Sequence, residues 1–237
     1  MTEVDRSPAS APGARDLPDP AGLRAVFFDF DGVILESVSI KDGAFRDLFA
    51  HLPEHLDRIL EHHREHLGHS RFEKFEWVYR RLLRRPLDEG ESRRLGESFS
   101  RRVEERMLSC PAVPGAVELL SALRGRIECM VVSGTPQAEL ERLIDGRDLR
   151  RYFRDVRGTP PAKGRHFVEL LHRYRLEPEE VLAVGDGLSD YRAAQDAGTH
   201  FVARSSASSG QDWSSIPVPT ISDLTDLFPL FGVRAGV

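Results

Sequence analysis

One stretch near the N-terminus constrains the fold more than any other: the apolar run Ala25 to Phe28, followed by Asp29 and Asp31. An uninterrupted run rich in Val and Phe is typical of a strand that a parallel sheet buries on both faces. Such a strand exposes side chains only where it ends, and open α/β sheets bind ligands at the carboxyl ends of their strands. The two carboxylates repel each other unless a cation or a proton relieves them. They therefore mark a candidate site, with a plain Asp31-Gly32 turn as the alternative.

A helical block interrupts the chain directly after this strand. Residues 38–110 show helical periodicity without a convincing strand, whereas strand-like and helix-like segments alternate after Pro114 and Gly115. That alternation predicts a parallel sheet covered by helices on both sides. We therefore expect an α/β protein with a Rossmann-like, doubly wound parallel core. Its expected parts are a disordered leader (1–22), the core (23–37 and 111–237) and an inserted all-helical cap (38–110).

Local signals place several boundaries within this scheme. The later strands are expected at Ile127–Val132, Tyr152–Val156, Val181–Val184 and His200–Ala203. Thr135 is expected to cap the helix after the first of these strands. In the cap, Gly68 suits the left-handed end of a helix. Ser70 and Glu73 predict an S-x-x-E capping box at the start of the next one.

Composition excludes several classes of protein. The net charge is -5 and the pI is about 6.0, so nothing draws the whole chain toward nucleic acid or an anionic membrane. No apolar run approaches the roughly 20 residues that a membrane span needs. Cys110 and Cys129 form no metal-binding spacing and are too few for a disulfide framework. We expect two buried thiols in a cytoplasmic protein without nucleic-acid or membrane partners.

Polar residues also follow the later predicted strands: Ser133, Lys163, Asp186 and Asp190. Because the carboxyl ends of parallel strands share one edge, these residues should meet Asp29 and Asp31 there. The chemistry that they could perform together is phosphoryl transfer, with a carboxylate as nucleophile and Mg²⁺ held by carboxylates and phosphate oxygens. Taken singly, each residue could equally be an ordinary turn, cap or surface residue.

The motif set resembles that of the haloacid-dehalogenase-like hydrolase superfamily. D-F-D-G-V at 29–33 is similar to its first motif, Ser133 to its second, Lys163 to its third and G-D-G-L-S-D at 185–190 to its fourth. The likeness covers about residues 24–230. A helical insertion after the first motif resembles the branch of phosphoglycolate phosphatase and β-phosphoglucomutase.

This resemblance implies a role for each core residue. Asp29 would be the nucleophile, and Asp31 would protonate the leaving oxygen and then activate water. Ser133 and the Gly134 N–H would hold a phosphoryl oxygen, and Lys163 would neutralise charge on the phosphoryl group and on Asp29. Mg²⁺ would lie between Asp29, the Asp31 carbonyl and Asp186, with Asp190 a direct or water-mediated partner.

The cap residues bear on the substrate. Gly68-His69-Ser70-Arg71 resembles the G-x-S-R loop of the mutase branch, whose Arg grips a second phosphate. Arg71 and Lys74 fall in the first turns of a predicted helix, where an anion is favoured. We expect both to bind substrate and His69 to face it, although a solvated basic helix start fits the pattern equally well. His62 and His66 have metal-ligand spacing, but the segment lacks a third ligand with clear geometry.

The function expected from these features is a Mg²⁺-dependent phosphatase that hydrolyses a small phosphorylated metabolite through an aspartyl-phosphate intermediate. Two alternatives remain: a sugar-phosphate mutase of the β-phosphoglucomutase type, and a non-catalytic scaffold that binds a phosphorylated ligand. Lys41 stands where the mutase branch has a His, which favours plain hydrolysis.

Overall fold

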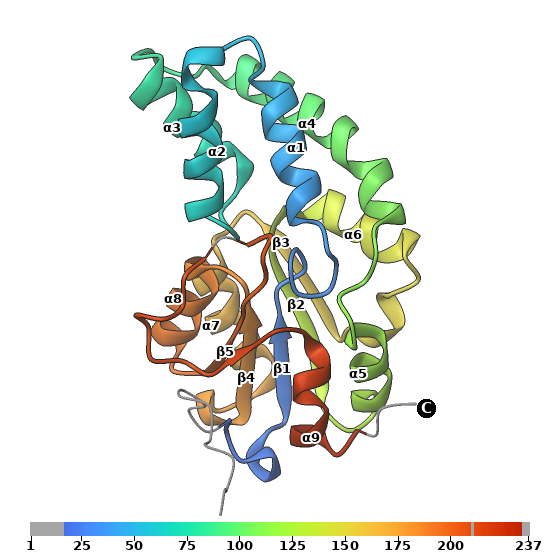
Figure 1. The fold of residues 1–237 in the computed structure, drawn as a ribbon. Helices are drawn as coiled ribbons and strands as arrows, with labels where there is room; N and C mark the ends of the chain where they lie inside the picture. Colours follow the sequence, from blue (N-terminus) through green and yellow to red (C-terminus); the bar gives the residue numbers. More distant parts are fainter. Residues whose placement is uncertain (1–16, 210, 234–237) are drawn as a thin grey trace, which may run out of the picture.

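A six-stranded, all-parallel sheet forms the centre of the protein in the computed structural model, which describes residues 17–209 and 211–233 (Figure 1). Its strand order is β3-β2-β1-β4-β5-β6. The strands are β1 (Ala25–Phe28), β2 (Glu128–Pro136), β3 (Asp155–Thr159), β4 (Val181–Gly185), β5 (His200–Arg204) and β6 (Thr220–Ile221). The expected fold class, a Rossmann-like parallel sheet flanked by helices, is confirmed.

Strand β1 lies in the middle of the sheet, and alternate side chains enter two different cores. Val26 and Phe28 pack in a hydrophobic cluster with α5 (Ala116–Leu123) and α6 (Gln137–Gly146). Ala25 and Phe27 pack on the opposite face with α7 (Lys163–Tyr174) and α8 (Leu188–Ala197). All four residues of β1 are buried, which explains why the run lacks the alternation of a half-exposed strand.

The helices inserted after β1 stand beyond the carboxyl ends of the strands (Figure 1). They are α1 (Val38–Leu48), η2 (Pro53–His55), α2 (Leu56–Glu65), α3 (Arg71–Trp77), a π-helical turn η3 (Val78–Leu82) and α4 (Glu89–Ser109). Aromatic rings fill the space between them, with the Phe45 ring centroid 5.0 Å from that of Phe99 and 5.8 Å from that of Phe75.

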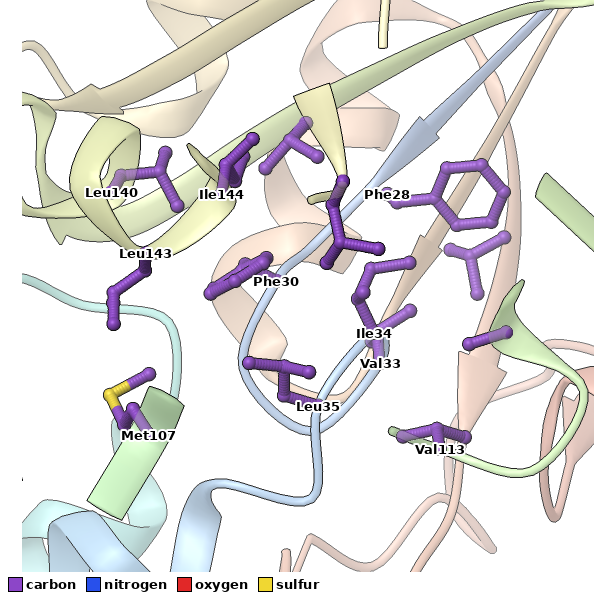
Figure 2. Close-up of a cluster of buried hydrophobic side chains, with 14 of the residues drawn as sticks. Phe28, Phe30, Val33, Ile34, Leu35, Met107, Val113, Leu140, Leu143 and Ile144 are labelled. Carbon is purple, nitrogen blue, oxygen red and sulfur yellow. The ribbon is translucent and has the colours of Figure 1, made fainter. Parts of the chain in front are cut away.

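One hydrophobic cluster continues from the sheet into these inserted helices (Figure 2). Phe30 and Leu35, from the loop after β1, lie beside Met107 of α4 and Leu143 of α6. All four side chains are fully buried. The inserted helices are therefore seated on the core by apolar packing as well as by the polar contacts described below.

Several boundaries differ from the sequence expectation. Strand β3 begins at Asp155 rather than Tyr152, because residues 150–152 form the 3-10 turn η4. Thr135 lies within β2, and Pro136 occupies the N-cap position of α6 without a side-chain hydrogen bond. The expected capping box is incomplete: Ser70 accepts a hydrogen bond from Phe72 N at 3.3 Å, but the Glu73 carboxylate turns to His69 instead.

The remaining elements close the sheet at its ends. η1 (Pro20–Gly22) precedes β1, η5 (Pro178–Glu180) precedes β4, and η6 (Leu224–Leu227) with α9 (Phe228–Phe231) follow β6. Of the expected leader, residues 1–16 lie outside the described residues, and 17–22 include η1. Cys110 and Cys129 are buried free thiols, as expected. None of the helices in the described ranges has the length and apolar character to cross a membrane.

Candidate active site

Asp29 directly follows β1, level with the end of the neighbouring strand β4. The last residue of β1, Phe28, pairs with Val131 of β2 and with Val184 of β4. The Asp29 side chain is only 3% exposed. Gly32 then turns the chain at a φ of +72°, and a Cβ at this position would lie 2.1 Å from Asp186 Oδ2. Glycine is therefore required here, both for the backbone conformation and for the close approach of Asp186.

Three buried carboxylates converge at this edge. One oxygen from each of Asp29, Asp186 and Asp190 lies within 4.8 Å of the others. Burial, together with the neighbouring negative charges, raises the pKa of Asp29 to about 7 and that of Asp186 well above its ordinary value. Asp186 Oδ2 has no hydrogen-bond partner among the described residues, although buried polar atoms normally have one.

Lys163 supplies a positive charge to this cluster from the start of α7. Its Nζ lies 2.9 Å from Asp29 Oδ2, in ion-pair range but without hydrogen-bond geometry, and donates to Asp190 Oδ1 at 2.5 Å. Burial alone would lower the pKa of Lys163, but the two carboxylates raise it. One ammonium group opposes three carboxylates, so the unbalanced negative charge and the orphaned oxygen fit a divalent cation with a preference for oxygen ligands.

Asp31 belongs to a separate hydrogen-bond network. It accepts hydrogen bonds from Lys41 Nζ at 2.5 Å, Ser37 Oγ at 2.6 Å and Thr135 Oγ1 at 2.9 Å. Burial alone would raise the pKa of Asp31, but the Lys41 charge and the three hydrogen bonds lower it. The two aspartates of the first motif therefore lie in opposite electrostatic environments: the pKa of Asp29 is raised, and that of Asp31 is lowered.

Ser133 and Gly134 bring the end of β2 to the same edge. Ser133 is 1% exposed, and its Oγ accepts a hydrogen bond from Thr135 N at 3.1 Å. A Cβ on Gly134 would lie 2.2 Å from the carbonyl oxygen of Gly68 in the cap. Because Gly134 has no side chain, the backbone of Gly68 can contact the end of β2, where Ser133 and Gly134 are the expected phosphate ligands.

The loop after α2 is the part of the cap that touches this edge. Gly68 adopts the expected left-handed conformation at a φ of +78°, and a Cβ there would lie 2.9 Å from Lys163 Nζ. Leu67 O accepts a hydrogen bond from Ser189 Oγ at 3.0 Å. These contacts bring the loop against the core, and a cavity of about 40 Å³ remains between the inserted helices and the core. Its lining includes Asp31, Lys41, His69, Lys74 and Asp186.

A larger cavity of about 270 Å³ adjoins this one and is lined by Ser133, Lys163, His69 and Arg192, among others. A more voluminous cavity, of about 810 Å³, lies elsewhere, between α3, α4 and α6. It does not touch the carboxylate cluster, so size does not identify the reactive site in this protein. The residues that line the smaller cavities do identify it, because they include Asp31, Asp186 and three lysines, Lys41, Lys74 and Lys163.

Lys74 is a buried cation directed from α3 toward the small cavity. Its Nζ lies 2.9 Å from His63 Nδ1 and donates to His63 O at 3.2 Å. Burial, with the nearby Lys41 charge, lowers the pKa of Lys74 to about 7. Burial likewise lowers the pKa of His63 to about 3, so this imidazole is neutral and its Nδ1 can accept a hydrogen bond from Lys74 Nζ. On its far side, His63 Nε2 lies 3.2 Å from Asp42 Oδ1.

Arg71 and His69 are placed differently from Lys74. The Arg71 guanidinium donates to Glu139 Oε1 of α6 at 2.6 Å and to Ser100 Oγ of α4 at 2.9 Å. It lies in the 810 Å³ cavity and is absent from the linings of the two cavities at the carboxylates. His69 lines both of those cavities, while its Nδ1 lies 3.0 Å from Glu73 Oε2. Only His69 and Lys74 of the expected cap residues thus face the site.

The sequence interpretation missed three residues of this arrangement. In the sequence, Lys41 favours hydrolysis over mutase chemistry but gives no sign that its ammonium group contacts Asp31. Thr135 was expected to cap a helix but donates to Asp31. Glu139 carried no local signal, because its partner Arg71 is 68 residues away in the chain. The one usable signal was the position of Lys41 in the first turn of the helix that follows the first motif.

Sequence comparison places the chain in a known family. The model of the haloacid dehalogenase-like hydrolases matches residues 23–198, which is most of the chain. The protein belongs to this family. It is an enzyme, a hydrolase of phosphoric monoesters, with the four motifs arranged around one site as described above.

Individual relatives point to one branch of the family. The chain is 29% identical to a phosphoglycolate phosphatase of Synechococcus elongatus over 186 residues, covering 76% of this chain and 83% of the relative. It is 30% identical over 192 residues to a phosphoglycolate phosphatase of Nitrosospira multiformis, covering 76% and 82%. Among solved structures, a predicted phosphoglycolate phosphatase from Haemophilus somnus matches with a TM-score of 0.70 at 18% identity, covering 88% of this chain and 98% of that one.

Proposed function

We propose that the protein is a Mg²⁺-dependent phosphatase that works through an aspartyl phosphate on Asp29. The observation that carries this proposal is the convergence of three buried carboxylates on Lys163, with Asp186 Oδ2 left without a partner. Phosphoryl transfer needs a positioned nucleophile and positive charge around the transferred group. Asp29 and Lys163, 2.9 Å apart at the end of β1, could supply them.

In the first step Asp29 attacks phosphorus, and the bond from phosphorus to the leaving oxygen breaks. The proton that the leaving oxygen needs comes from Asp31. In the second step Asp31 takes a proton from water, whose oxygen attacks the phosphorus and returns Asp29 as a carboxylate. An ionised Asp31, stabilised by Lys41, suits this second step. Its role as an acid requires that Lys41 moves away from it, which binding of an anionic substrate would favour.

Mg²⁺ would be held by Asp29, Asp186 and the Asp31 carbonyl, and it would supply charge neutralisation for the phosphoryl group. Asp190 would act chiefly by positioning Lys163, because Lys163 Nζ and Gly187 N already donate to its carboxylate at 2.5 Å and 3.3 Å. Ser133 Oγ and Gly134 N would donate to a phosphoryl oxygen, and Lys163 would neutralise another.

We further propose that the substrate is small and carries a second anionic group. The cavity of about 40 Å³ is too small for a sugar ring. Beside Asp31 and Asp186, its lining includes two lysines and two histidines: Lys41, Lys74, His63 and His69. The adjoining space of about 270 Å³ extends it only on the side of Ser133 and Lys163. Phosphoglycolate, which the relatives' names state for them, has this chemistry and is the first substrate to test.

Domain movement is part of this proposal. Residues 38–110 would form a cap that opens from the core, 23–37 and 111–233, to admit the substrate. The contacts of Leu67 and Gly68 with Ser189, Gly134 and Lys163 would form in the closed state. With two buried free thiols and no candidate membrane helix among the described residues, we place the protein in the cytoplasm.

The decisive experiment is a screen of phosphate release with Mg²⁺. Phosphoglycolate, several sugar phosphates and an aryl phosphate would be compared, with β-glucose 1-phosphate and a trace of the bisphosphate to detect mutase activity. We expect the highest kcat/KM on phosphoglycolate or another short phosphorylated acid. Isomerisation of the sugar phosphate without phosphate release would favour the mutase. Binding without turnover of any compound would favour the scaffold.

A further inference from the structure

We propose that the cap carries a second metal site, for a transition ion of the Zn²⁺ class, formed by His62, Glu65 and His66. One donor atom from each of these residues lies within 4.8 Å of the other two. The site is separate from the carboxylate cluster of the core, and it is built from nitrogen and carboxylate ligands. Imidazole donors suit Zn²⁺, Cu²⁺ and Ni²⁺, whereas Mg²⁺ prefers oxygen.

The end of α2 brings the two imidazoles together. His62 and His66 are four residues apart, so their side chains project from one face, and their ring centroids are 3.9 Å apart. Residue 66 is the C-cap of α2, where carbonyl groups lack helical partners. His66 Nδ1 takes up one of them, the carbonyl of His62, at 2.9 Å.

That hydrogen bond prepares His66 for metal binding. A carbonyl can only accept, so Nδ1 carries the proton, and Nε2 keeps a lone pair that is free to bind a metal. Histidines that bind metals in proteins commonly donate their other N–H to a backbone carbonyl in this way, which fixes both the tautomer and the ring orientation. The contact between His66 Nδ1 and the His62 carbonyl therefore holds the ring in an orientation that suits binding through Nε2.

His62 and Glu65 complete the donor set. The His62 ring stacks on Trp77 at 3.8 Å between centroids and 8° between planes, which fixes its orientation. Among the described residues, neither ring nitrogen of His62 and neither carboxylate oxygen of Glu65 has a hydrogen-bond partner. Two imidazoles and one carboxylate match the three-ligand sets that proteins use for Zn²⁺, with water as the fourth ligand.

The site adjoins the loop that closes the active site. His66 is followed directly by Leu67 and Gly68, which contact Ser189 and lie against Lys163. An ion bound across the last turn of α2 would fix the start of this loop. The sequence alone showed only the His62–His66 spacing, and Glu65 becomes a third donor because the last turn of α2 brings it to the same face.

Trp77 provides a direct readout of binding. The chain has two tryptophans, so in the Trp213→Phe background Trp77 is the sole source of indole fluorescence. Tag-free protein would be titrated with Ni²⁺ in excess Mg²⁺, which fills the core carboxylates, and Zn²⁺ would then be added as a competitor. We expect Ni²⁺ to quench Trp77 saturably and Zn²⁺ to reverse the quenching. Equilibrium dialysis with Zn²⁺ should give one additional ion per chain.

Three variants decide the assignment. His66→Ala should raise the apparent Kd for Ni²⁺ by at least about tenfold. Removing a group that hydrogen-bonds a metal ligand already weakens binding by about that factor, and removing the ligand itself should weaken it no less. Glu65→Gln should weaken binding less, and both variants should keep Mg²⁺-dependent phosphatase activity. The matched control is His51→Ala/His55→Ala, which removes two cap histidines of the same spacing that gather no third donor. Unchanged binding in His66→Ala, or equal loss in the control, would overturn the proposal.

Discussion

Arg71 of the cap and Glu139 of the core form an ion pair with an N–O distance of 2.6 Å, and each side chain is only 4% exposed. Ser100 Oγ donates to the second oxygen of Glu139 at 2.6 Å, and the guanidinium lies 4.4 Å from the centre of the Phe99 ring. The hydrogen bonds from Arg71 and Ser100 to Glu139 join elements that must separate if the cap opens. The pair therefore acts as a clasp between cap and core rather than as part of the phosphate pocket.

Glu139→Gln tests this clasp. Breaking a buried pair by removing one charge costs about 3–5 kcal/mol, because the other charge is left without compensation. We expect Tm to fall by several degrees, and kcat/KM to fall by a similar factor on phosphoglycolate and on an aryl phosphate. Arg71→Ala should behave in the same way. If Arg71→Ala selectively impaired phosphoglycolate, Arg71 would have to leave Glu139 and bind the substrate, as the sequence pattern suggested.

Lys74→Met should impair turnover of phosphoglycolate more than that of an aryl phosphate, whereas Glu139→Gln and Arg71→Ala should affect both substrates alike. The substitution keeps the apolar stem and removes a charged donor that lines the small cavity. A charged hydrogen bond contributes about 1.5–3 kcal/mol, so kcat/KM on phosphoglycolate should fall by about one to two powers of ten. The aryl phosphate, without a second anion, should be nearly unaffected.

The stability of the Lys74 variant provides the control. Burial lowers the pKa of Lys74 to about 7, which shows that the fold disfavours a charge at this position. Lys74→Met should therefore not lower Tm at pH values below 7. A lower Tm with equal losses on both substrates would assign Lys74 to the structure of the cap and not to recognition.

Lys41→Met should change the pH profile of the reaction. Lys41 contacts Asp31 at 2.5 Å and is the main reason that the pKa of Asp31 is lowered. Without this charge the pKa of Asp31 rises. Because Asp31 must be protonated to act as the acid of the first step, the limb of the kcat/KM profile that falls at high pH should move to higher pH. Lys41→Arg keeps the charge and should keep the limb near its original position. An identical limb in all three proteins would show that Asp31 does not govern it.

His63 should make the fold sensitive to acid. It is 2% exposed, its ring stacks on Phe45 at 4.2 Å, and burial lowers its pKa from 6.5 to about 3. Between these two values the unfolded chain binds a proton that the folded chain does not. The free energy of unfolding should therefore fall as pH decreases from 6.5 toward 3, by up to about 1.4 kcal/mol per pH unit.

Denaturant unfolding of the wild type and of His63→Gln would measure this effect between pH values of about 4.5 and 6.5. In that interval the neighbouring Asp42, whose pKa is lowered, remains ionised and contributes little to the slope. The variant should show the shallower dependence on pH. Equal slopes would mean that His63 is protonated in the folded protein.

The parts of this structure that sequence predicts well are those with local causes. The four-residue run of β1 is buried on both faces, and the register of parallel strands then forces Asp29, Ser133 and Asp186 onto one edge. Contacts between the cap and the core have no local cause, because their partners are far apart in the sequence. From the sequence, Arg71 is predicted to be a free cation at the start of a helix, whereas the fold pairs it with Glu139 of α6. The Thr135 hydroxyl is likewise predicted to cap a helix, whereas in the fold it donates a hydrogen bond to Asp31 in the loop after β1.

The most direct test of the mechanism is to look for the covalent intermediate on Asp29. Enzyme mixed with excess phosphoglycolate and Mg²⁺ would be quenched in acid within the first turnovers, and its peptides would be examined by mass spectrometry. The account predicts one phosphoryl group on the peptide that contains Asp29, localised to that side chain, and none in the isosteric Asp29→Asn variant, which should fold normally and release no phosphate. Ordinary turnover by Asp29→Asn, or a phosphoryl group on another residue, would contradict it.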